Sequence, residues 1–236
     1  KAKEVDAAIL KLLKDPEAGV RSRAVEVLCS RGRIAAEILP LLKDPDPAVR
    51  KSVLRAVEWK EDAEASRQAA PLLEDPDPQV RECALECVSR RREKAAVPLL
   101  LKMAGLQDPE ERAKVLQALA KIGDPAALTL FASLLDSPDR SERHLGIFGI
   151  LEMDKAWNAD LAPKLLGLLD DPDGHLRSSA ARVLARHGVR FPLEKLDPLL
   201  GHEDQLVRRV ALGVLAILRD PASIPKVIPL LQDKEE

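Results

Sequence analysis

The side chains best suited to catalysis or metal binding in this sequence are its three cysteines and four histidines. Cys83 and Cys87 lie one helical turn apart, but Cys29 stands far upstream. A structural zinc ion usually takes four Cys or His ligands with close pair spacing. Gly-rich phosphate loops, nucleophile elbows and Ser-His-Asp sets are not recognisable either. We therefore expect no catalytic, metal-binding or cofactor-binding residues and no enzyme activity. The histidines fall in four separate segments, at His144, His175, His187 and His202.

Arginine is the other residue type with an obvious chemical use, because its guanidinium group binds carboxylates and phosphates. One arginine recurs along the chain at spacings of 29, 31, 31, 31, 34 and 31 residues. An acidic residue stands four positions before each of them, within reach of the same turn. We therefore expect these arginines to tie one turn to the next and not to form a phosphate-binding stripe. They are Arg21, Arg50, Arg81, Arg112, Arg143, Arg177 and Arg208.

This spacing belongs to an internal repeat in which each unit reads as two helices. The acidic residue before the arginine is Asp in six of seven units, and Asp is a preferred helix N-cap. Small or apolar residues follow the arginine three and seven positions later, as in a packed helix. Prolines placed to kink the first helix are Pro40, Pro71, Pro198 and Pro229, and glycines placed as helix C-caps are Gly32, Gly123 and Gly188. The repeat predicts one all-α domain over 1–236, with units of about 1–31, 32–61, 62–92, 93–123, 124–156, 157–188, 189–219 and a partial eighth, 220–236.

The turn between the two helices carries a motif that covers nearly the whole chain. Its clearest copy is Leu41-Leu42-Lys43-Asp44-Pro45-Asp46-Pro47-Ala48-Val49-Arg50. The motif resembles the HEAT-repeat family, in particular its short repeats of the phycobilisome-lyase type. The resemblance implies a right-handed α-solenoid, with the second helix of each unit on the concave side and with Asp and Arg side chains laddering between units. HEAT-like deoxyhypusine hydroxylases hold iron with several His-Glu pairs. This sequence has one such pair, His202-Glu203, so the resemblance does not imply hydroxylase activity.

The overall composition limits the class of partner. The chain carries 37 Lys and Arg against 39 Asp and Glu, a formal net charge of −2, which argues against a protein built as a whole to coat nucleic acid. Charged residues make up 32% of the chain, and no apolar run approaches the roughly 18 residues that a membrane span needs. Three cysteines form no disulfide framework. We expect a cytoplasmic protein without membrane insertion.

The surface positions one and five residues after the repeated arginine supply the candidate binding residues. Their charges are mixed early in the chain and basic late, and units four and five are uncharged and partly apolar. The longer spacing of 34 also inserts a segment that carries a tryptophan. Exposed apolar surface flanked by charge is typical of a partner-binding site, although Phe148 could instead fill space left by Gly146 and Gly149. The candidates are Lys51, Arg55, Glu82, Glu86, Gln117, His144, Phe148, Trp157, Arg182 and Arg209.

These patterns favour a non-catalytic scaffold that binds a segment of a partner protein along its concave face. One alternative is a nucleic-acid-binding solenoid that uses Arg55, Arg182, Arg209 and the cluster Arg90–Arg92; another is an accessory subunit of a lyase-like enzyme. The sequence ends after the first helix of its eighth unit. We expect either that the chain is excised from a longer protein or that self-association covers the apolar residues of that end, which are Ile224, Val227, Ile228 and Leu231.

Overall fold

The computed structural model describes residues 2–31, 36–58, 63–223 and 225, and these residues form helices and turns without a strand. The chain divides into two compact units, Lys1–Asp124 and Pro125–Glu236, here called unit 1 and unit 2. The division falls one residue after the expected end of the fourth repeat. The prediction of an all-α repeat fold is confirmed. Most of the expected partial eighth repeat lies outside the described residues, and so do Gly32, Pro229 and the apolar residues proposed to mediate self-association.

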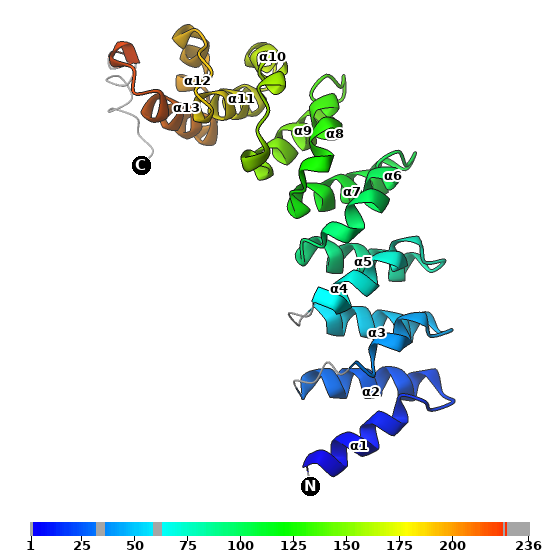
Figure 1. Ribbon diagram of the computed structural model, residues 1–236. Coiled ribbons are helices and arrows are strands. Elements are labelled where there is room, and N and C mark those ends of the chain that lie inside the picture. The colour runs from blue at the N-terminus through cyan, green and yellow to red at the C-terminus, as the bar shows by residue number, and fades with distance from the viewer. Residues whose placement is uncertain (1, 32–35, 59–62, 224, 226–236) are drawn as a thin grey trace. The chain divides into compact units, whose positions relative to one another are not determined.

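Unit 1 is a row of helical hairpins, and its second helices pack side by side in the order α2, α3, α5 and α7 (Figure 1). The longer second helices carry most of the fully buried side chains, including Leu28, Leu54 and Leu119. The elements are α1 (Ala2–Leu12), α2 (Ala18–Ser30), the 3₁₀ helix η1 (Leu39–Lys43), α3 (Pro47–Glu58), α4 (Ala63–Ala69), η2 (Ala70–Glu74), α5 (Pro78–Arg90), η3 (Lys94–Ala96), α6 (Val97–Met103) and α7 (Pro109–Ile122).

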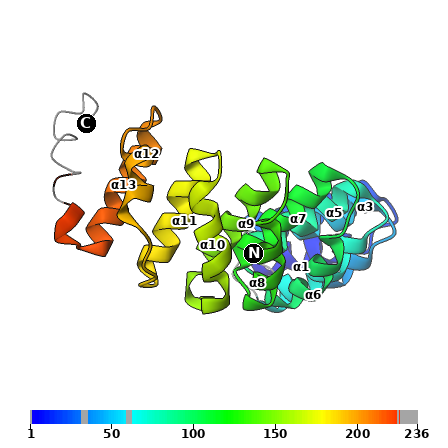
Figure 2. The same cartoon turned by 90° about the horizontal axis from the view of Figure 1, so that it is seen from above.

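Unit 2 repeats this arrangement, with α9, α11 and α13 packed in succession (Figure 2). Its elements are η4 (Pro125–Ala127), α8 (Leu128–Leu134), α9 (Arg140–Glu152), η5 (Asp154–Ala156), η6 (Ala159–Leu161), α10 (Ala162–Gly167), η7 (Leu168–Asp170), α11 (Gly174–Arg186), η8 (Leu193–Leu196), α12 (Asp197–Leu200), α13 (Gln205–Leu218) and η9 (Pro221–Ser223).

The predicted helix ends are confirmed in detail. The Asp77 carboxylate accepts hydrogen bonds from the backbone N–H groups of Gln79 and Val80 and so caps α5, and the other five predicted aspartate caps accept in the same way. Glu17, the one glutamate in this position, makes no such bond. Gly123 and Gly188 have φ angles of 68° and 70°, the left-handed conformation that ends a helix at low cost for glycine.

The prolines distort the first helices, as expected. Pro40 and Pro71 lie at the starts of η1 and η2, where the chain forms a 3₁₀ helix, and Pro198 is the second residue of the four-residue α12. Proline lacks the N–H group that an α-helix interior requires. The first helices after α1 are therefore short and broken, and the intact second helices hold the candidate side chains other than Trp157.

The two glycines of α9 make room for an aromatic ring from its partner helix. Phe131 of α8 is fully buried, and a Cβ atom at Gly149 would lie 2.3 Å from its ring. A Cβ at Gly146 would lie 2.9 Å from the Phe131 carbonyl oxygen and from Leu135. The idea that Phe148 fills the space beside these glycines is therefore wrong. Phe131 fills it, and Phe148 is 38% exposed.

Candidate functional site

Several of the repeated arginines join the turn of their own repeat to the turn of the next one, namely Arg21, Arg50 and Arg143. Arg50 donates from Nε and Nη2 to the carboxylate of Asp75 at 2.8 and 2.7 Å. Its Nη1 donates to the backbone carbonyls of Asp44 and Pro45. Arg21 binds Asp44 in the same bidentate way at 2.8 and 2.7 Å. Arg143 binds Asp171 in the corresponding place. The structural prediction is confirmed for these three arginines, and the carboxylates they bind stand six residues before the next repeated arginine.

Each of these aspartates, here called ladder aspartates, also accepts a backbone hydrogen bond within its own turn. Asp44 accepts the backbone N–H of Asp46 at 2.9 Å, and Asp75 accepts that of Asp77 at the same distance. Burial alone would raise the pKa of Asp44, but the hydrogen bonds from Arg21 and from the Asp46 N–H outweigh burial and lower it. The Asp44 carboxylate therefore stays charged, and paired with Arg21, at a lower pH than an ordinary aspartate would.

The ladder position is occupied by another residue type in three repeats: Leu106, Ser137 and His202. Ser137 and His202 keep the turn, because Ser137 Oγ accepts the Asp139 N–H at 3.1 Å and His202 Nδ1 accepts the Asp204 N–H at 3.0 Å. Leu106 has no side-chain acceptor. The next arginine, Arg112, donates its Nε to the carbonyl of Ala104 at 2.9 Å. The ladder is therefore interrupted most completely at Leu106.

Three of the predicted binding residues come together in a groove between α5 and α7. Glu82 and Glu86 of α5 face Gln117 of α7 across this groove, whose volume is about 510 Å³. Leu85 and Ala118 supply its apolar surface. Lys114 spans it, with Nζ 2.9 Å from Glu82 Oε1. The remaining residues along the groove are Ser89, Arg90, Arg92 and Lys121.

The two predicted residues on α3 lie next to α5 without lining this groove. Lys51 donates from Nζ to the side-chain oxygen of Gln79. Arg55 is exposed and interacts with Cys83, whose pKa is raised chiefly by burial. Cys87 is fully buried, and burial raises its pKa to about 12. A thiol with such a pKa stays protonated at neutral pH, so Cys87 is a packing residue as its position in the repeat predicts.

The predicted residues of unit 2 are distributed over several contacts. His144 Nε2 lies 2.8 Å from Asp173 Oδ2, which also binds Arg140. Burial would raise the pKa of Asp173, but these partners and the capped N–H groups of α11 hold it well below the usual range. The Trp157 ring stacks on the ring of His187, with centroids 4.3 Å apart and planes 2° from parallel. Trp157 therefore anchors the inserted segment to the end of α11.

Three predicted residues of unit 2 have accessible surface that a partner could contact, namely Phe148, Arg182 and Arg209. Phe148 is partly exposed on α9 and Arg209 is exposed on α13. Arg182 is half-buried on α11, and burial followed by the charge of Arg186 lowers its pKa. Its Nε is buried and has no hydrogen-bond partner within the described residues.

The cluster Arg90–Arg92 lies at the end of α5, where Arg90 and Arg92 also line the groove. Arg90 Nε lies 2.7 Å from Glu58 Oε1 of α3. Arg92 has a φ angle of 52° and turns the chain after the helix.

In the part of the chain that the structure covers, no group of His, Cys, Asp and Glu side chains is arranged to hold a metal ion. None of the helices described there has the length and apolar character needed to cross a membrane.

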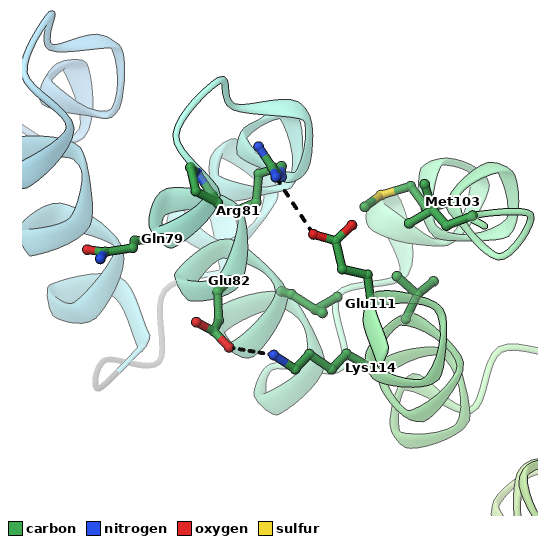
Figure 3. A pocket seen from close by; sticks show the side chains of 10 residues that line it. Gln79, Arg81, Glu82, Met103, Glu111 and Lys114 are labelled. Carbon is green, nitrogen blue, oxygen red and sulfur yellow. Dashed lines mark hydrogen bonds and ion pairs between the residues drawn. The ribbon is translucent and has the colours of Figure 1, made fainter. Parts of the chain in front are cut away.

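A second, smaller pocket of about 230 Å³ lies beside the groove and was not foreseen from the sequence (Figure 3). It is lined by Arg81 and Leu85 from α5, Met103 from α6, and Glu111 and Val115 from α7, together with Pro78, Gln79, Glu82, Leu106 and Lys114. The signal that could have found it is the change of motif at this turn. Met103-Ala104 stands where most repeats have a leucine pair, and Leu106 stands at the ladder position.

Comparison with known proteins supports the repeat assignment. The family described as HEAT repeats matches residues 6–74, 67–148 and 162–236. No match was found among curated proteins. The YibA protein of Escherichia coli is similar in structure, with a TM-score of 0.61 and 19% identity over 98% of this chain and 88% of that one.

Two other solved structures share the fold. An archaeal HEAT-like repeat protein from Thermococcus onnurineus NA1 has a TM-score of 0.59 and 15% identity, covering 91% of this chain and 97% of that one. The complex of CpcE and CpcF of phycocyanin lyase from Nostoc sp. PCC7120 has a TM-score of 0.51 and 20% identity, covering 96% and 93%. Each similarity extends over almost the whole chain, so the comparison concerns the repeat array and not an isolated helical hairpin.

Proposed function

Since the chain belongs to the HEAT-repeat family, we propose that it is a non-catalytic scaffold that binds a segment of a partner protein in the groove between α5 and α7. The observation that carries the proposal is the groove itself, about 510 Å³ in volume and held by two packed helices. A peptide bound on a rigid surface loses less affinity to the ordering of its receptor. HEAT repeats are usually non-catalytic, and their stacked helices offer extended surface for binding.

The charges along the groove favour a peptide over a nucleic acid. Glu82 and Glu86 place negative charge on α5, and Arg90 and Arg92 add positive charge where that helix ends. Lys114 and Lys121 place positive charge on the α7 side. A phosphate backbone would meet repulsion from the two glutamates, because nucleic-acid affinity depends on neutralising phosphates with basic side chains. A peptide with basic and acidic residues in the matching order complements both sides.

The proposal is tested with peptides selected for binding to the full chain from a random library displayed on phage. Their affinities are then measured by fluorescence anisotropy for the wild type, Glu86→Lys and the control Glu64→Lys. Glu64 lies on α4, outside the groove, and pairs with Arg67 on the same helix. We expect Glu86→Lys to weaken binding about fivefold or more, which corresponds to roughly 1 kcal/mol, and Glu64→Lys to leave it unchanged. Equal affinities for the two variants would refute the assignment to this groove.

A second surface for the same function is the pair Phe148 and Arg182 in unit 2. Phe148 is exposed, and Arg182 has a buried Nε without a hydrogen-bond partner among the described residues. Aromatic residues and arginine are enriched in protein interfaces. Phe148→Ala and Arg182→Ala should then weaken peptide capture without lowering thermal stability. If duplex DNA binds instead, with an affinity that falls steeply with salt and is lost in Arg182→Ala, the nucleic-acid alternative replaces this proposal.

A further inference from the structure

The small pocket at Arg81 stands where the ladder lacks its carboxylate. Arg21 and Arg50 each bind an aspartate with two hydrogen bonds, but the corresponding position for Arg81 is Leu106. Arg81 keeps the bonds from Nη1 to the carbonyls of Asp75 and Pro76, at 3.0 and 3.3 Å. Its Nη2 lies 3.8 Å from Glu111 Oε1, beyond hydrogen-bond range. The edge of the guanidinium group that binds aspartate elsewhere in unit 1 thus faces Glu111 in a longer ion pair and holds no hydrogen-bonded carboxylate among the described residues.

The walls of this pocket are apolar, although its rim is charged. Leu85, Met103, Leu106 and Val115 line it, with Pro78 at one side. Figure 3 shows Arg81 and Glu111 approaching one another from α5 and α7, and Glu82 and Lys114 joined below them. The pocket therefore offers one guanidinium group beside a patch of apolar surface, within a volume of about 230 Å³.

We propose that this pocket binds the C-terminal residue of a partner protein, with the α-carboxylate on Arg81 in the place of the missing ladder aspartate and an apolar side chain against Leu85, Met103 and Val115. This proposal rests on the proposed scaffold function and assigns a second, more specific subsite beside the groove. Glu82, Leu85 and Lys114 line both cavities, so a chain that ends in the pocket can continue into the groove.

The size of the pocket favours a chain terminus over an internal acidic residue. A C-terminal residue carries its carboxylate and its side chain on the same Cα atom, so both fit one small cavity. In an extended internal segment, adjacent side chains point to opposite faces, and residues two apart are separated by more than 6 Å. Capture of a terminal carboxylate is an established mode of peptide recognition, and a guanidinium group suits it because it binds carboxylates with two hydrogen bonds.

Glu111 modulates this site, because its carboxylate competes with the ligand for Arg81. Its side chain is 53% exposed, and its distance of 3.8 Å from Arg81 leaves it free to turn outward. Its role in the helix is carried by its backbone N–H, which donates to Asp108 at 2.8 Å. Replacing Glu111 by Gln removes the competing charge and leaves this backbone capping bond in place.

The test uses N-acetyl-L-leucine as the probe and N-acetyl-L-leucinamide as its uncharged counterpart. Both are titrated into the full chain with ¹³C-labelled Leu, Val and Met methyl groups, and chemical shifts are followed by NMR. We expect N-acetyl-L-leucine to bind with a dissociation constant of about 1–10 mM, the range for a ligand of this size. Shifts should concentrate at the methyl groups of Met103, Leu106 and Val115. The amide should bind at least about tenfold more weakly, since it lacks the charge-assisted hydrogen bonds.

Three variants make the result specific. Leu106→Asp supplies the missing carboxylate to Arg81 and should abolish binding, whereas Leu106→Asn, of the same size and without charge, should retain most of it. Glu111→Gln should tighten binding several-fold. Equal binding of the acid and the amide, equal affinities in Leu106→Asp and Leu106→Asn, or preference for a peptide with an internal Leu-Asp pair and an amidated end would each overturn the proposal.

The same variants separate this inference from the scaffold function. Glu86 lines the groove but not the small pocket, whereas Leu106 lines the pocket but not the groove. If Glu86→Lys weakens the selected peptides and Leu106→Asp has no effect on peptides or probe, the scaffold function stands and the C-terminal subsite is refuted. If the probe binds normally and Glu86→Lys has no effect on any peptide, the subsite stands without the groove.

Discussion

Removing the carboxylate of Asp75 should destabilise the protein more than any change at an exposed ion pair. The side chains of Arg50 and Asp75 are 10% and 7% exposed and share two hydrogen bonds of 2.7 and 2.8 Å. Loss of one partner of a buried pair costs about 3–5 kcal/mol, because the other charge is left buried without compensation. Arg50 keeps its bonds to the carbonyls of Asp44 and Pro45, so we expect the lower end, about 3 kcal/mol, for Asp75→Ala.

This value is measured by urea unfolding followed by far-ultraviolet circular dichroism. The control is Glu64→Ala, which removes an ion pair whose side chains are 57% and 61% exposed. Exposed pairs contribute about 0–1 kcal/mol. The double variant Arg50→Met with Asp75→Ala should recover part of the loss, because it removes the stranded charge. If Asp75→Ala costs no more than Glu64→Ala, the ladder does not stabilise the turns in the way described here.

Three further predictions concern stability. Leu106→Asp should raise the free energy of unfolding by about 1 kcal/mol, the net value of a typical added hydrogen bond, because it completes the ladder with Arg81; a lower urea midpoint would contradict this. Gly149→Ala should lower the free energy of unfolding by about 1–3 kcal/mol, because the new Cβ overlaps the Phe131 ring. Gly213→Ala on α13, where a Cβ meets nothing within 4 Å, should instead raise it by about 0.5–1 kcal/mol through helix propensity. Thermal unfolding of the two variants checks the sign of each change. The pKa of Asp44 is below its ordinary value of 3.8 in the folded state, so its contribution is complete above about pH 4–5 and is lost as the pH falls toward the folded pKa. Asp44→Asn should flatten the fall in urea midpoint between about pH 5 and pH 2, and an unchanged pH profile would count against the Arg21 pairing.

Features that depend on local sequence were predictable, because their physics lies within a few residues. The Asp77 cap, the left-handed Gly123 and the distorted first helix at Pro71 follow from hydrogen bonds and dihedral angles inside one turn. The pairing of a repeated arginine with an acidic residue, as at Arg21 and Arg50, also follows from the repeat. Its partner, however, is the aspartate six residues before the next arginine, as Arg50 and Asp75 show.

Contacts that depend on packing between distant positions were not predictable in the same way. The sequence shows Gly146 and Gly149 but not that Phe131, fifteen or more residues earlier, occupies their space. Trp157 stands out by its rarity, yet its stacking on His187 depends on the path of the inserted segment. Likewise, Glu82, Glu86 and Gln117 were predicted as surface residues, but the groove between them depends on the spacing of α5 and α7.

The ladder position shows how a repeat array can acquire a binding site without losing its fold. This position closes the turn by accepting the N–H of the second residue after it, and an aspartate here also binds the preceding arginine. Asp15, Asp44, Asp75 and Asp171 close their turns in this way, and so do Ser137 and His202 without a carboxylate. Leu106 fulfils neither task, and Arg112 stabilises that turn through the Ala104 carbonyl.

Leu106 neither closes its turn nor binds an arginine, and it also lines an apolar pocket beside Arg81. Arg81 still holds its own turn through the carbonyls of Asp75 and Pro76, so the fold keeps the arginine in place while releasing its carboxylate-binding edge. A ladder arginine is held rigid by contacts that do not involve its aspartate. Replacement of that aspartate by an apolar residue therefore turns a structural ion pair into a preorganised receptor for a carboxylate from outside the chain.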